Sequence, residues 1–316
     1  MQAVIVAGGK GTRLRPFTLQ TPKPLLPLLE LSFLEWMIGR CREAGLVDIL
    51  LNVGYLGEKI EAYLQAGEQL GVKIRYVRED TPLDTAGSLV LAKPYFTGEP
   101  LVVFNADILT DLDLKQVMAW HEQSGAIATL TLTRVEDITA FGLVEIDDNN
   151  RILAFREKPS PEEAATITTD TINAGTYVLD PSIFDAYPEG EPLSFERRVF
   201  PGLLEDGKLM SAYIHEGYWR DLGTPRSYYQ GQLDLLTGAL QETTFLSGAA
   251  ERSSGVWVHP SATVDDSATL AAPCYVGSDC KLGPNADLPA GAVVTTRCWV
   301  DKRLEPGVYA PGTLAV

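Results

Sequence analysis

Residues 3–13 of this 316-residue chain read AVIVAGGKGTR, an unbroken apolar run followed at once by a glycine-rich turn. A continuous apolar run is typical of a strand that is buried on both faces of a sheet. Further short apolar runs then alternate with stretches of helical spacing. The expected strands are residues 49–53, 72–77 and 101–104, and the expected helices are residues 34–44, 58–66 and 86–92. This alternation predicts a Rossmann-like α/β fold, in which a doubly wound sheet is covered by helices.

Beyond residue 126 the apolar runs lie closer together. Residues 128–132 and 142–146 have the composition of two more strands. We expect them to extend the sheet, to make it mixed, and to form part of a lid over the substrate.

A six-residue repeat occupies the C-terminal part of the chain. An aliphatic residue recurs at every sixth position, and a small residue follows most of them by four positions. The aliphatic positions are Val258, Val264, Leu270, Val276, Leu282, Leu288, Val294 and Val300, and the small ones are Ala262, Ala268, Cys274, Cys280, Ala286, Ala292 and Cys298. Such a repeat predicts a short left-handed parallel β-helix of hexapeptides. The three cysteines among the small residues are then expected at corners of the coil, without a redox or metal role.

The change of period divides the chain. We expect a catalytic domain over residues 1–236, a linker rich in small polar residues over 237–255, and the β-helix over 256–316.

Composition excludes several classes of protein. The formal net charge of −16 argues against a nucleic-acid partner, which would require a basic face. No apolar run approaches the ~20 residues needed to cross a bilayer, and the first residues lack the charged region of a signal peptide. We therefore expect a cytoplasmic protein without a membrane partner. Its 4 cysteines show no CxxC spacing, and its 3 histidines lie far apart in the sequence. Both observations argue against a zinc site.

The glycine-rich turn points to a phosphate ligand. Gly8, Gly9 and Gly11 would let backbone N–H groups approach phosphate oxygens closely. The turn matches neither GxxxxGK[ST] nor GxGxxG, because Leu14 stands where the latter needs its third glycine. Taken alone, the glycines fit a tight turn between strand and helix equally well.

Nearby cations favour the phosphate interpretation. Arg13 and Arg15 follow the glycines directly, and Lys23 lies between Pro22 and Pro24. The two prolines stiffen the backbone around this lysine. A lysine held in this way suits a fixed phosphate contact better than a packing role.

Together these motifs resemble the signature of the NDP-sugar pyrophosphorylases, the sugar-1-phosphate nucleotidyltransferases. The family patterns AGGxGTRLxPxT and PKPLLP stand at residues 7–18 and 22–27. Further family motifs follow in order: LDTAG at 83–87, FNAD at 104–107, FG at 141–142, EKP at 157–159, NAGTY at 173–177 and WRDLGTP at 219–225. Residues 135–137, 194–201 and 215–219, together with the β-helix, resemble most the mannose-1-phosphate guanylyltransferase branch.

The resemblance implies one reaction. An oxygen of a sugar 1-phosphate attacks the α-phosphorus of an NTP in line, and pyrophosphate leaves. Arg13 would stabilise the pyrophosphate, and Lys23 would bridge the α-phosphate and the sugar phosphate. Asp107 and Asp221 would hold Mg²⁺, which prefers one or two carboxylates together with phosphates and water. Asp107 also lies just beyond the end of an expected strand, where open α/β sheets bind ligands. Asp221 could instead form an Asx-turn or cap the helix expected near Pro225.

The resemblance also implies binding residues. Those for the nucleotide are Ala7, Gly8, Gly9, Gly11, Thr12, Arg13, Ala86 and Gly87. Those for the sugar phosphate are Gly142, Glu157, Lys158, Asn173 and Trp219. Two positions depart from the family pattern, since Asp84 and Ala106 stand where glycine is usual. The change at Asp84 leaves the choice of base open.

Several alternatives remain at this stage. Glucose-1-phosphate thymidylyl-, uridylyl- and adenylyltransferases share most of these motifs, and the LDT at residues 83–85 is closer to a muramic-acid-type uridylyltransferase. Hexapeptide β-helices also occur in acyltransferases, for which His259 would be the candidate histidine. A catalytically silent regulatory homologue is a third possibility, against which the intact Arg13, Lys23 and aspartates count. We also expect a homo-oligomer, with the β-helix as the candidate contact.

Overall fold

The computed structural model describes residues 1–135, 141–157 and 169–316. These form two compact units. The first comprises Met1–Lys10, Met37–Ile108 and Leu112–Trp219, and the second comprises Gly11–Trp36, Leu109–Asp111 and Arg220–Val316. The boundaries expected at residues 236 and 255 stay predictions. Within the described ranges, no helix combines the length and apolar character that crossing a bilayer would require.

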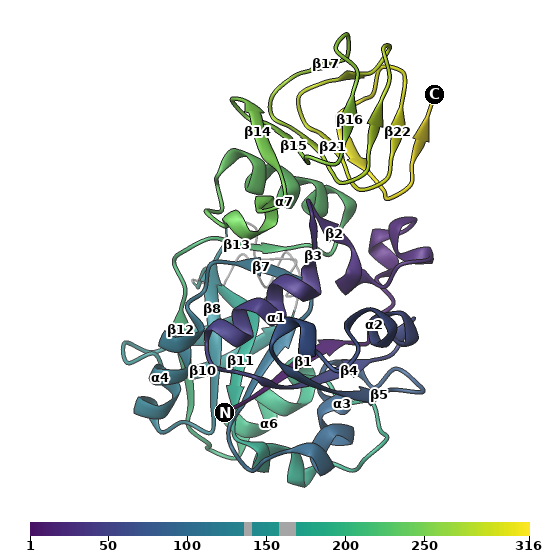
Figure 1. Ribbon diagram of the computed structural model, residues 1–316. Coiled ribbons are helices and arrows are strands. Elements are labelled where there is room, and N and C mark those ends of the chain that lie inside the picture. Colours follow the sequence, from purple (N-terminus) through teal and green to yellow (C-terminus); the bar gives the residue numbers. More distant parts are fainter. Residues whose placement is uncertain (136–140, 158–168) are drawn as a thin grey trace. The chain divides into compact units, whose positions relative to one another are not determined.

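The described part of the first unit is built on one mixed sheet of nine strands (Figure 1). Its order is β10-β9-β11-β6-β1-β4-β5, and β8 pairs with both β11 and β12. The strands are β1 (Gln2–Ala7), β4 (Asp48–Val53), β5 (Lys73–Arg78), β6 (Leu101–Asn105), β8 (Ala128–Arg134), β9 (Gly142–Ile146), β10 (Ile152–Glu157), β11 (Thr171–Leu179) and β12 (Met210–Ile214). Strands β6, β1, β4 and β5 run parallel, whereas β11 pairs antiparallel with β6. The strands expected near residues 128 and 142 thus extend the same sheet.

Both faces of the parallel strands are buried, as the continuous apolar runs predict. Along β1, Ala3, Val4 and Ile5 are all 0 % exposed although successive side chains point to opposite faces. One face belongs to a core cluster in which Val4 and Leu50 pack with Leu89 of α3. The alternation of strands and helices therefore specifies a sheet with helices on both sides.

The helices of the chain begin and end at recognisable signals. Asp113 caps α4 by accepting hydrogen bonds from Lys115 N and Gln116 N at 2.9 and 3.3 Å, and Gly125 ends it in the left-handed region. The α-helices are α1 (Phe33–Glu43), α2 (Gly57–Leu64), α3 (Asp84–Ala92), α4 (Leu114–Ser124), α6 (Phe200–Glu205) and α7 (Pro225–Thr237). Short 3-10 helices are η1 (Thr12–Leu14), η2 (Phe17–Leu19), η3 (Lys23–Leu25), η4 (Glu68–Leu70), η5 (Lys93–Tyr95), η6 (Pro181–Ala186) and η8 (Thr243–Leu246), and η7 (Phe195–Val199) is a π-helix.

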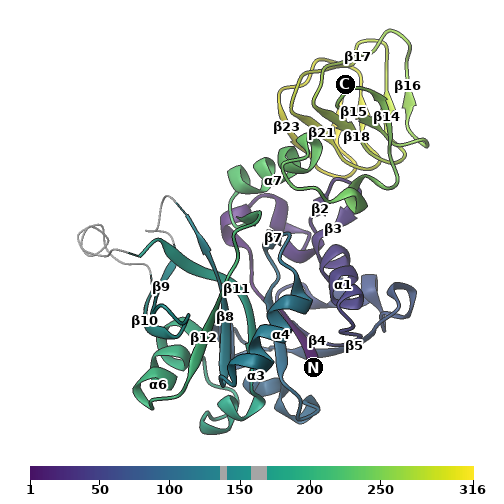
Figure 2. The same cartoon turned by 90° about the vertical axis from the view of Figure 1, so that its left-hand side faces the viewer.

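The second unit contains a region of short parallel strands stacked in an 18-residue register (Figure 2). Its strands are β14 (Ala250–Ser253), β15 (Val256–Val258), β16 (Thr263–Val264), β17 (Thr269–Leu270), β18 (Cys274–Val276), β19 (Lys281–Leu282), β20 (Asp287–Leu288), β21 (Ala292–Val294), β22 (Trp299–Val300), β23 (Gly307–Tyr309) and β24 (Leu314–Ala315). Val256 lies opposite Cys274, and Thr263 opposite Lys281. The repeat residues from Val276 to Val300 form one buried cluster. This arrangement is compatible with the expected β-helix.

Two short strand pairs complete the described strands, and the expected linker belongs to the second unit. β2 (Pro27–Leu28) pairs with β3 (Leu31–Ser32), and β7 (Ile108–Thr110) pairs with β13 (Trp219–Asp221). The expected linker is more ordered than its composition indicates, because β14 within it pairs antiparallel with β15.

Candidate active site

In the first unit, the glycine-rich turn begins where β1 ends at Ala7. A Cβ on Gly8 would stand 2.7 Å from Glu79 Oε1, so a larger residue there would require the end of the Glu79 side chain to move. A Cβ on Gly9 would meet no described atom within 4 Å. Gly9 therefore exposes its backbone to open space, as a phosphate contact would need.

In the second unit, the rest of the turn is joined to the lysine between two prolines. Gly11 has a φ of 57°, in the left-handed region, and a Cβ there would lie 3.1 Å from Lys23 Cβ. Thr18 Oγ1 donates to Gly11 O at 2.8 Å, which fixes the turn against the next segment. Lys23 begins η3, and Leu26 N donates to its carbonyl at 3.1 Å. Gly11 itself thus lies next to Lys23.

Arg13 and Asp221 meet at a glycine that the sequence analysis did not single out. A Cβ on Gly223 would stand 2.5 Å from Asp221 Oδ1 and 2.8 Å from Arg13 Nη2. Gly223 N donates to Asp221 Oδ1 at 2.7 Å, so the Asx-type turn considered for this aspartate is present. Thr224, not Asp221, caps α7. The structure thus brings an exposed guanidinium and a half-buried carboxylate to one point.

Asp107 lies half-buried in the turn between β6 and β7. Ala106 N donates to Val6 O at 3.3 Å, which ties this turn to the central strand β1. The carboxylate therefore follows the carboxyl end of a parallel strand, the edge at which open α/β sheets bind ligands. No group of three or more His, Cys, Asp or Glu among the described residues is placed to hold a metal.

The expected sugar-phosphate residues of the first unit gather around residues 173–175. Asn173 Nδ2 donates to Tyr177 OH at 2.8 Å, and Gly175 N donates to Asn173 Oδ1 at 3.1 Å. The register of β11 against β8 shifts between Asn173 and Tyr177, an irregularity of the kind often found beside active sites. Trp219 Nε1 donates to Ala174 O at 2.9 Å.

Two further expected residues, Gly142 and Glu157, lie on the neighbouring strands β9 and β10. Trp219 meets the ring of Phe141 edge-on at a centroid distance of 5.4 Å. Gly142 lies opposite Glu157 in the β9–β10 pair. Lys158 lies outside the described residues.

Two expected nucleotide residues have their amide groups occupied by the protein. Ala86 N and Gly87 N both donate to Leu193 O, at 2.8 and 3.1 Å. A Cβ on Gly87 would lie 2.8 Å from Glu191 O, so this glycine permits close packing of two backbone segments. Any nucleotide contact from Ala86 or Gly87 would have to use other atoms.

The departure at Asp84 has a structural consequence. This residue has a φ of 63°, in the left-handed region that the family's glycine would occupy without strain. Aspartate tolerates this region better than most residues because its side chain bonds locally, and Asp84 Oδ1 accepts from Thr85 N at 2.9 Å.

Sequence reasoning missed Glu79, which lies next to the glycine-rich turn. Leu83 N donates to its Oε2 at 3.1 Å. Burial raises the pKa of Glu79, and the bond from Leu83 N only partly offsets this effect. An acidic residue directly after the third parallel strand was the available signal.

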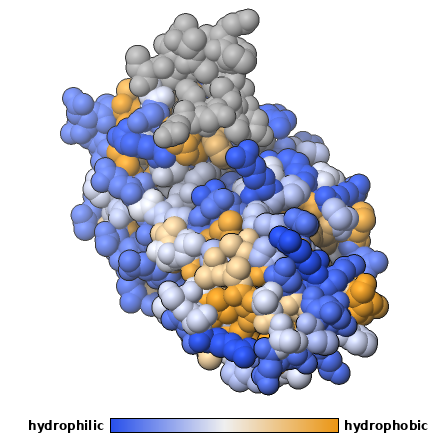
Figure 3. All heavy atoms as spheres, turned by 90° about the horizontal axis from the view of Figure 1, so that it is seen from above, coloured by the Kyte–Doolittle hydropathy of each residue, from blue (hydrophilic) through white to orange (hydrophobic). Residues whose placement is uncertain are grey.

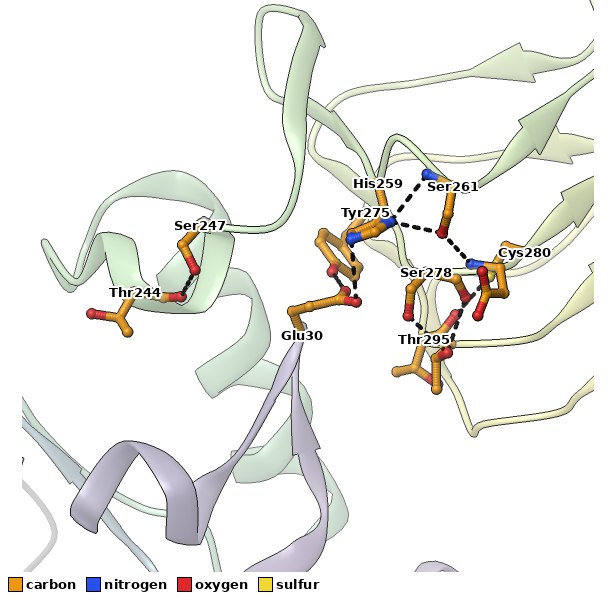
Figure 4. Close-up of polar contacts among 11 residues, drawn as sticks. Glu30, Thr244, Ser247, His259, Ser261, Tyr275, Ser278, Cys280 and Thr295 are labelled. Atoms are coloured by element: carbon orange, nitrogen blue, oxygen red, sulfur yellow. Dashed lines mark hydrogen bonds and ion pairs between the residues drawn. The ribbon is translucent and has the colours of Figure 1, made fainter. Parts of the chain in front are cut away.

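His259, the histidine an acyltransferase would require, belongs to a polar cluster in the second unit (Figure 4). Its Nδ1 lies 2.8 Å from Ser261 Oγ, and its Nε2 lies 3.9 Å from Glu30 Oε1. Tyr275 OH donates to the same Glu30 carboxylate. These contacts join the turn between β2 and β3 to the stacked strands.

The three cysteines of the repeat are buried. Cys280 and Cys298 are each 1 % exposed within the repeat cluster.

Comparison with known proteins decides the family. Residues 2–238 match the family model described as Nucleotidyl transferase. The chain belongs to this nucleotidyl transferase family. Mannose-1-phosphate guanylyltransferase of Mycobacterium tuberculosis is 38 % identical over 295 residues, which are 93 % of this chain and 79 % of that protein. UTP–glucose-1-phosphate uridylyltransferase of a Synechocystis species is 32 % identical over 97 % of this chain and 85 % of that protein.

Solved structures of the family share the fold. HddC from Yersinia pseudotuberculosis superposes with a TM-score of 0.63 at 27 % identity, over 74 % of this chain and 98 % of that one. A putative glucose-1-phosphate thymidylyltransferase from Bacillus anthracis has a TM-score of 0.66 at 24 % identity, over 74 % and 94 % of the two chains. The α/β class and the enzyme class expected from the motifs are thereby confirmed.

Proposed function

We propose that this nucleotidyl transferase joins GTP and mannose 1-phosphate to give GDP-mannose and pyrophosphate. The observation that carries the proposal is the agreement among relatives. Mannose-1-phosphate guanylyltransferases from Mycobacterium, rice and Drosophila are 33 to 38 % identical over 87 to 95 % of this chain, so the similarity extends into the stacked strands. A structure of HddC complexed with GMP-PN, 26 % identical, also matches with a TM-score of 0.63.

In the proposed reaction a phosphate oxygen of mannose 1-phosphate forms a bond to the α-phosphorus of GTP. The bond from that phosphorus to the oxygen bridging the β-phosphate breaks, and pyrophosphate leaves with the electron pair. The protein supplies no covalent nucleophile. It positions two polyanions and offsets their repulsion, which is the main source of catalysis in phosphoryl-type transfer.

The residues divide these tasks. Gly9 offers open backbone to the triphosphate. The exposed Arg13 guanidinium neutralises charge on the departing pyrophosphate, and Lys23 holds the α-phosphate close to the sugar phosphate. Asn173 and Trp219, fixed by their bonds near residue 174, contact the sugar phosphate.

Asp107 and Asp221 are the proposed holders of Mg²⁺. Their oxygens are hard ligands of the kind this ion prefers, and Asp221 is oriented by the 2.7 Å bond from Gly223 N. When bound, the ion would neutralise phosphate charge and orient the phosphate oxygens.

The proposal is tested with a matrix of four NTPs against mannose, glucose and N-acetylglucosamine 1-phosphates, with Mg²⁺ and coupled detection of pyrophosphate. We expect the highest kcat/KM for GTP with mannose 1-phosphate. Absence of pyrophosphate release with every pair would overturn the enzyme assignment. Release only with another pair would overturn the choice of substrates.

A second candidate is uridylyl transfer to glucose 1-phosphate. It is favoured by the Synechocystis uridylyltransferase, whose similarity covers 97 % of this chain. In the same matrix it predicts that UTP with glucose 1-phosphate gives the highest kcat/KM.

We also propose that the stacked strands mediate a homo-oligomer. Trp299 and Leu314 lie opposite each other on β22 and β24 and are 53 % and 65 % exposed. On the face seen in Figure 3, apolar residues gather amid hydrophilic ones. Exposed apolar patches often mark protein interfaces. Sedimentation of the wild type against Trp299→Lys tests this, because an unchanged molecular mass would contradict it. We also propose that the reaction takes place in the cytoplasm, as the sequence predicts.

A further inference from the structure

In the second unit, helix α7 directly follows the turn that carries Asp221. Thr224 caps the helix, and its side chain accepts from Ser227 N at 3.1 Å. On the other side of the turn, Arg220 Nε donates to Asp234 Oδ2 at 2.7 Å, which ties the residue before Asp221 to the same helix. The Asp221 turn is therefore fixed to α7 at both of its ends.

The same helix holds the segment that follows Lys23. Gln232 Nε2 donates to Pro27 O at 2.7 Å, and Gln232 Oε1 accepts from Leu29 N at 2.8 Å. Tyr228 OH donates to the same Pro27 carbonyl. Residues four apart share one face of a helix, and α7 lies beside β2 and β3 in both views (Figures 1 and 2). One face of α7 thus fixes the backbone at the turn between these two strands.

These contacts are shielded from water. Gln232 is 0 % exposed and Tyr228 is 3 % exposed. Burial raises the pKa of Tyr228, so its hydroxyl stays protonated and remains a donor over the pH range of an enzyme assay. A buried backbone group that loses its partner pays the full cost of desolvation, so the segment is held in one position relative to the helix.

Short backbone bonds carry this position from Pro27 back to Lys23. Lys23 begins η3, and Leu26 N donates to its carbonyl at 3.1 Å. Pro24 lies buried inside the same short helix. The proline rings at 24 and 27 fix φ at two of the positions that connect the lysine to the bonded carbonyl. A shift of Pro27 would therefore move Lys23 as well.

We propose that Tyr228 and Gln232 are positioning residues for nucleotidyl transfer, which hold Lys23 at a fixed position relative to Asp221 through α7. This inference rests on the roles proposed above for Lys23 and Asp221. A lysine that bridges two phosphates has to be fixed relative to the carboxylate that holds their metal ion, because a misplacement of about 1 Å costs ~100-fold in rate. Tyr228 and Gln232 act on the backbone and need no contact with either substrate.

Tyr228→Phe and Tyr229→Phe form a matched pair of variants. Each removes one hydroxyl of α7 that donates to a backbone carbonyl, since Tyr229 OH donates to Gly291 O in the stacked strands at 2.9 Å. Each carbonyl also keeps a second donor, which is Gln232 Nε2 in the first case and Gly307 N, at 3.1 Å, in the second. The two variants therefore differ mainly in the segment that they release.

We expect Tyr228→Phe to lower kcat for GTP with mannose 1-phosphate by on the order of 10-fold. Tyr229→Phe should stay within about twofold of the wild type. The variant keeps the aromatic ring at position 228 and hence its contact with Phe17, at a centroid distance of 5.8 Å, and urea unfolding checks that both proteins are folded. An unchanged kcat in Tyr228→Phe would overturn the inference, and so would an equal fall in both variants.

A double-mutant cycle with Lys23 distinguishes positioning from a general structural role. Lys23→Met removes the charge, so a residue that acts only through Lys23 then has nothing left to position. Gln232→Met keeps the length of the side chain and removes both of its bonds. We expect it to lower kcat by about 10- to 100-fold when Lys23 is present and by less than about twofold in Lys23→Met. Equal fold losses in the two backgrounds would overturn the inference.

The outcomes separate this inference from the proposed function. No pyrophosphate release by the wild type with any NTP would overturn both. Turnover that is unchanged in Lys23→Met would overturn the role of the lysine, and the inference with it. Turnover that depends on Lys23, with Tyr228→Phe as active as Tyr229→Phe, would overturn only the positioning role.

Discussion

A substitution at Gly223 perturbs the candidate active site most directly. Its φ lies outside the left-handed region, so alanine can adopt the same backbone and the effect of Gly223→Ala arises from the added methyl group. That methyl would stand 2.5 Å from Asp221 Oδ1 and 2.8 Å from Arg13 Nη2. Since ordinary contact begins at 3.4 Å, the carboxylate has to retreat by roughly 1 Å, and the guanidinium by somewhat less.

Such a displacement predicts a large kinetic effect and a smaller effect on stability. Misplacing a catalytic group by about 1 Å can cost ~100-fold in rate, so we expect kcat and kcat/KM to fall on that order. Overpacking of this size typically costs about 1–3 kcal/mol in the free energy of unfolding. The rate is measured by pyrophosphate release from GTP and mannose 1-phosphate, and the stability by urea unfolding.

Gly39→Ala is the matched control. A Cβ on Gly39 within α1 would meet no described atom within 4 Å. Alanine there should raise the free energy of unfolding by up to about 1 kcal/mol and leave kcat unchanged. If Gly223→Ala folds like the wild type and retains its kcat within twofold, the roles given to Arg13 and Asp221 are wrong.

Three further predictions concern other sites. Asp107→Asn should reduce turnover by at least ~100-fold while the urea midpoint stays near that of the wild type; near-normal turnover with saturating Mg²⁺ would remove this residue from the metal site. Burial lowers the pKa of His121 below its ordinary value of 6.5, so the neutral ring stabilises the fold above that pH and this stability is lost as pH falls below it. His121→Asn can keep the contact that Nδ1 makes to Thr129 Oγ1 at 2.9 Å. It should reduce the decrease in urea midpoint between pH 7.5 and 5.5. An unchanged dependence of the midpoint on pH would refute this. Asp84→Gly should relieve the left-handed backbone and raise the free energy of unfolding by about 0.5–1 kcal/mol, which thermal unfolding would show; a clear loss of stability would mean that the bond to Thr85 N outweighs the strain.

The parts of the fold that repeat a simple period could be predicted from the sequence. The apolar run at Val4 and Ile5 specifies a strand buried on both faces, and both side chains are 0 % exposed. The six-residue spacing from Val276 to Val300 likewise places these aliphatics in one buried cluster. In each case the spacing of apolar residues within one segment determines which side chains are buried, because that spacing fits only one backbone conformation.

β14 shows where such patterns fail. Its residues Ala250–Ser253 are all exposed, so no alternation of apolar residues marks them as a strand. Their pairing with β15 depends on backbone hydrogen bonds that any sequence can form.

Residues of the candidate site could be predicted where charged side chains cluster in the sequence. They could not be predicted where a residue's role depends on contacts with distant parts of the chain. Arg13 and Asp221 were expected, but Gly223 has meaning only because both reach it. Glu79 escaped notice for the same reason, since its place beside the glycine-rich turn depends on the approach of Gly8 from another strand. The amide groups of Ala86 and Gly87, expected to serve the nucleotide, are instead bonded to a segment more than a hundred residues away.

Internal competition tests the central claim most directly. The purified protein is given Mg²⁺, mannose 1-phosphate and an equimolar mixture of GTP, ATP, UTP and dTTP, and the nucleotide sugars formed at low conversion are quantified by mass spectrometry. Product ratios then equal ratios of kcat/KM for the four nucleotides. We predict GDP-mannose as the dominant product, with one pyrophosphate released for each molecule formed. Dominance of another nucleotide sugar, or no product at all, would contradict the account.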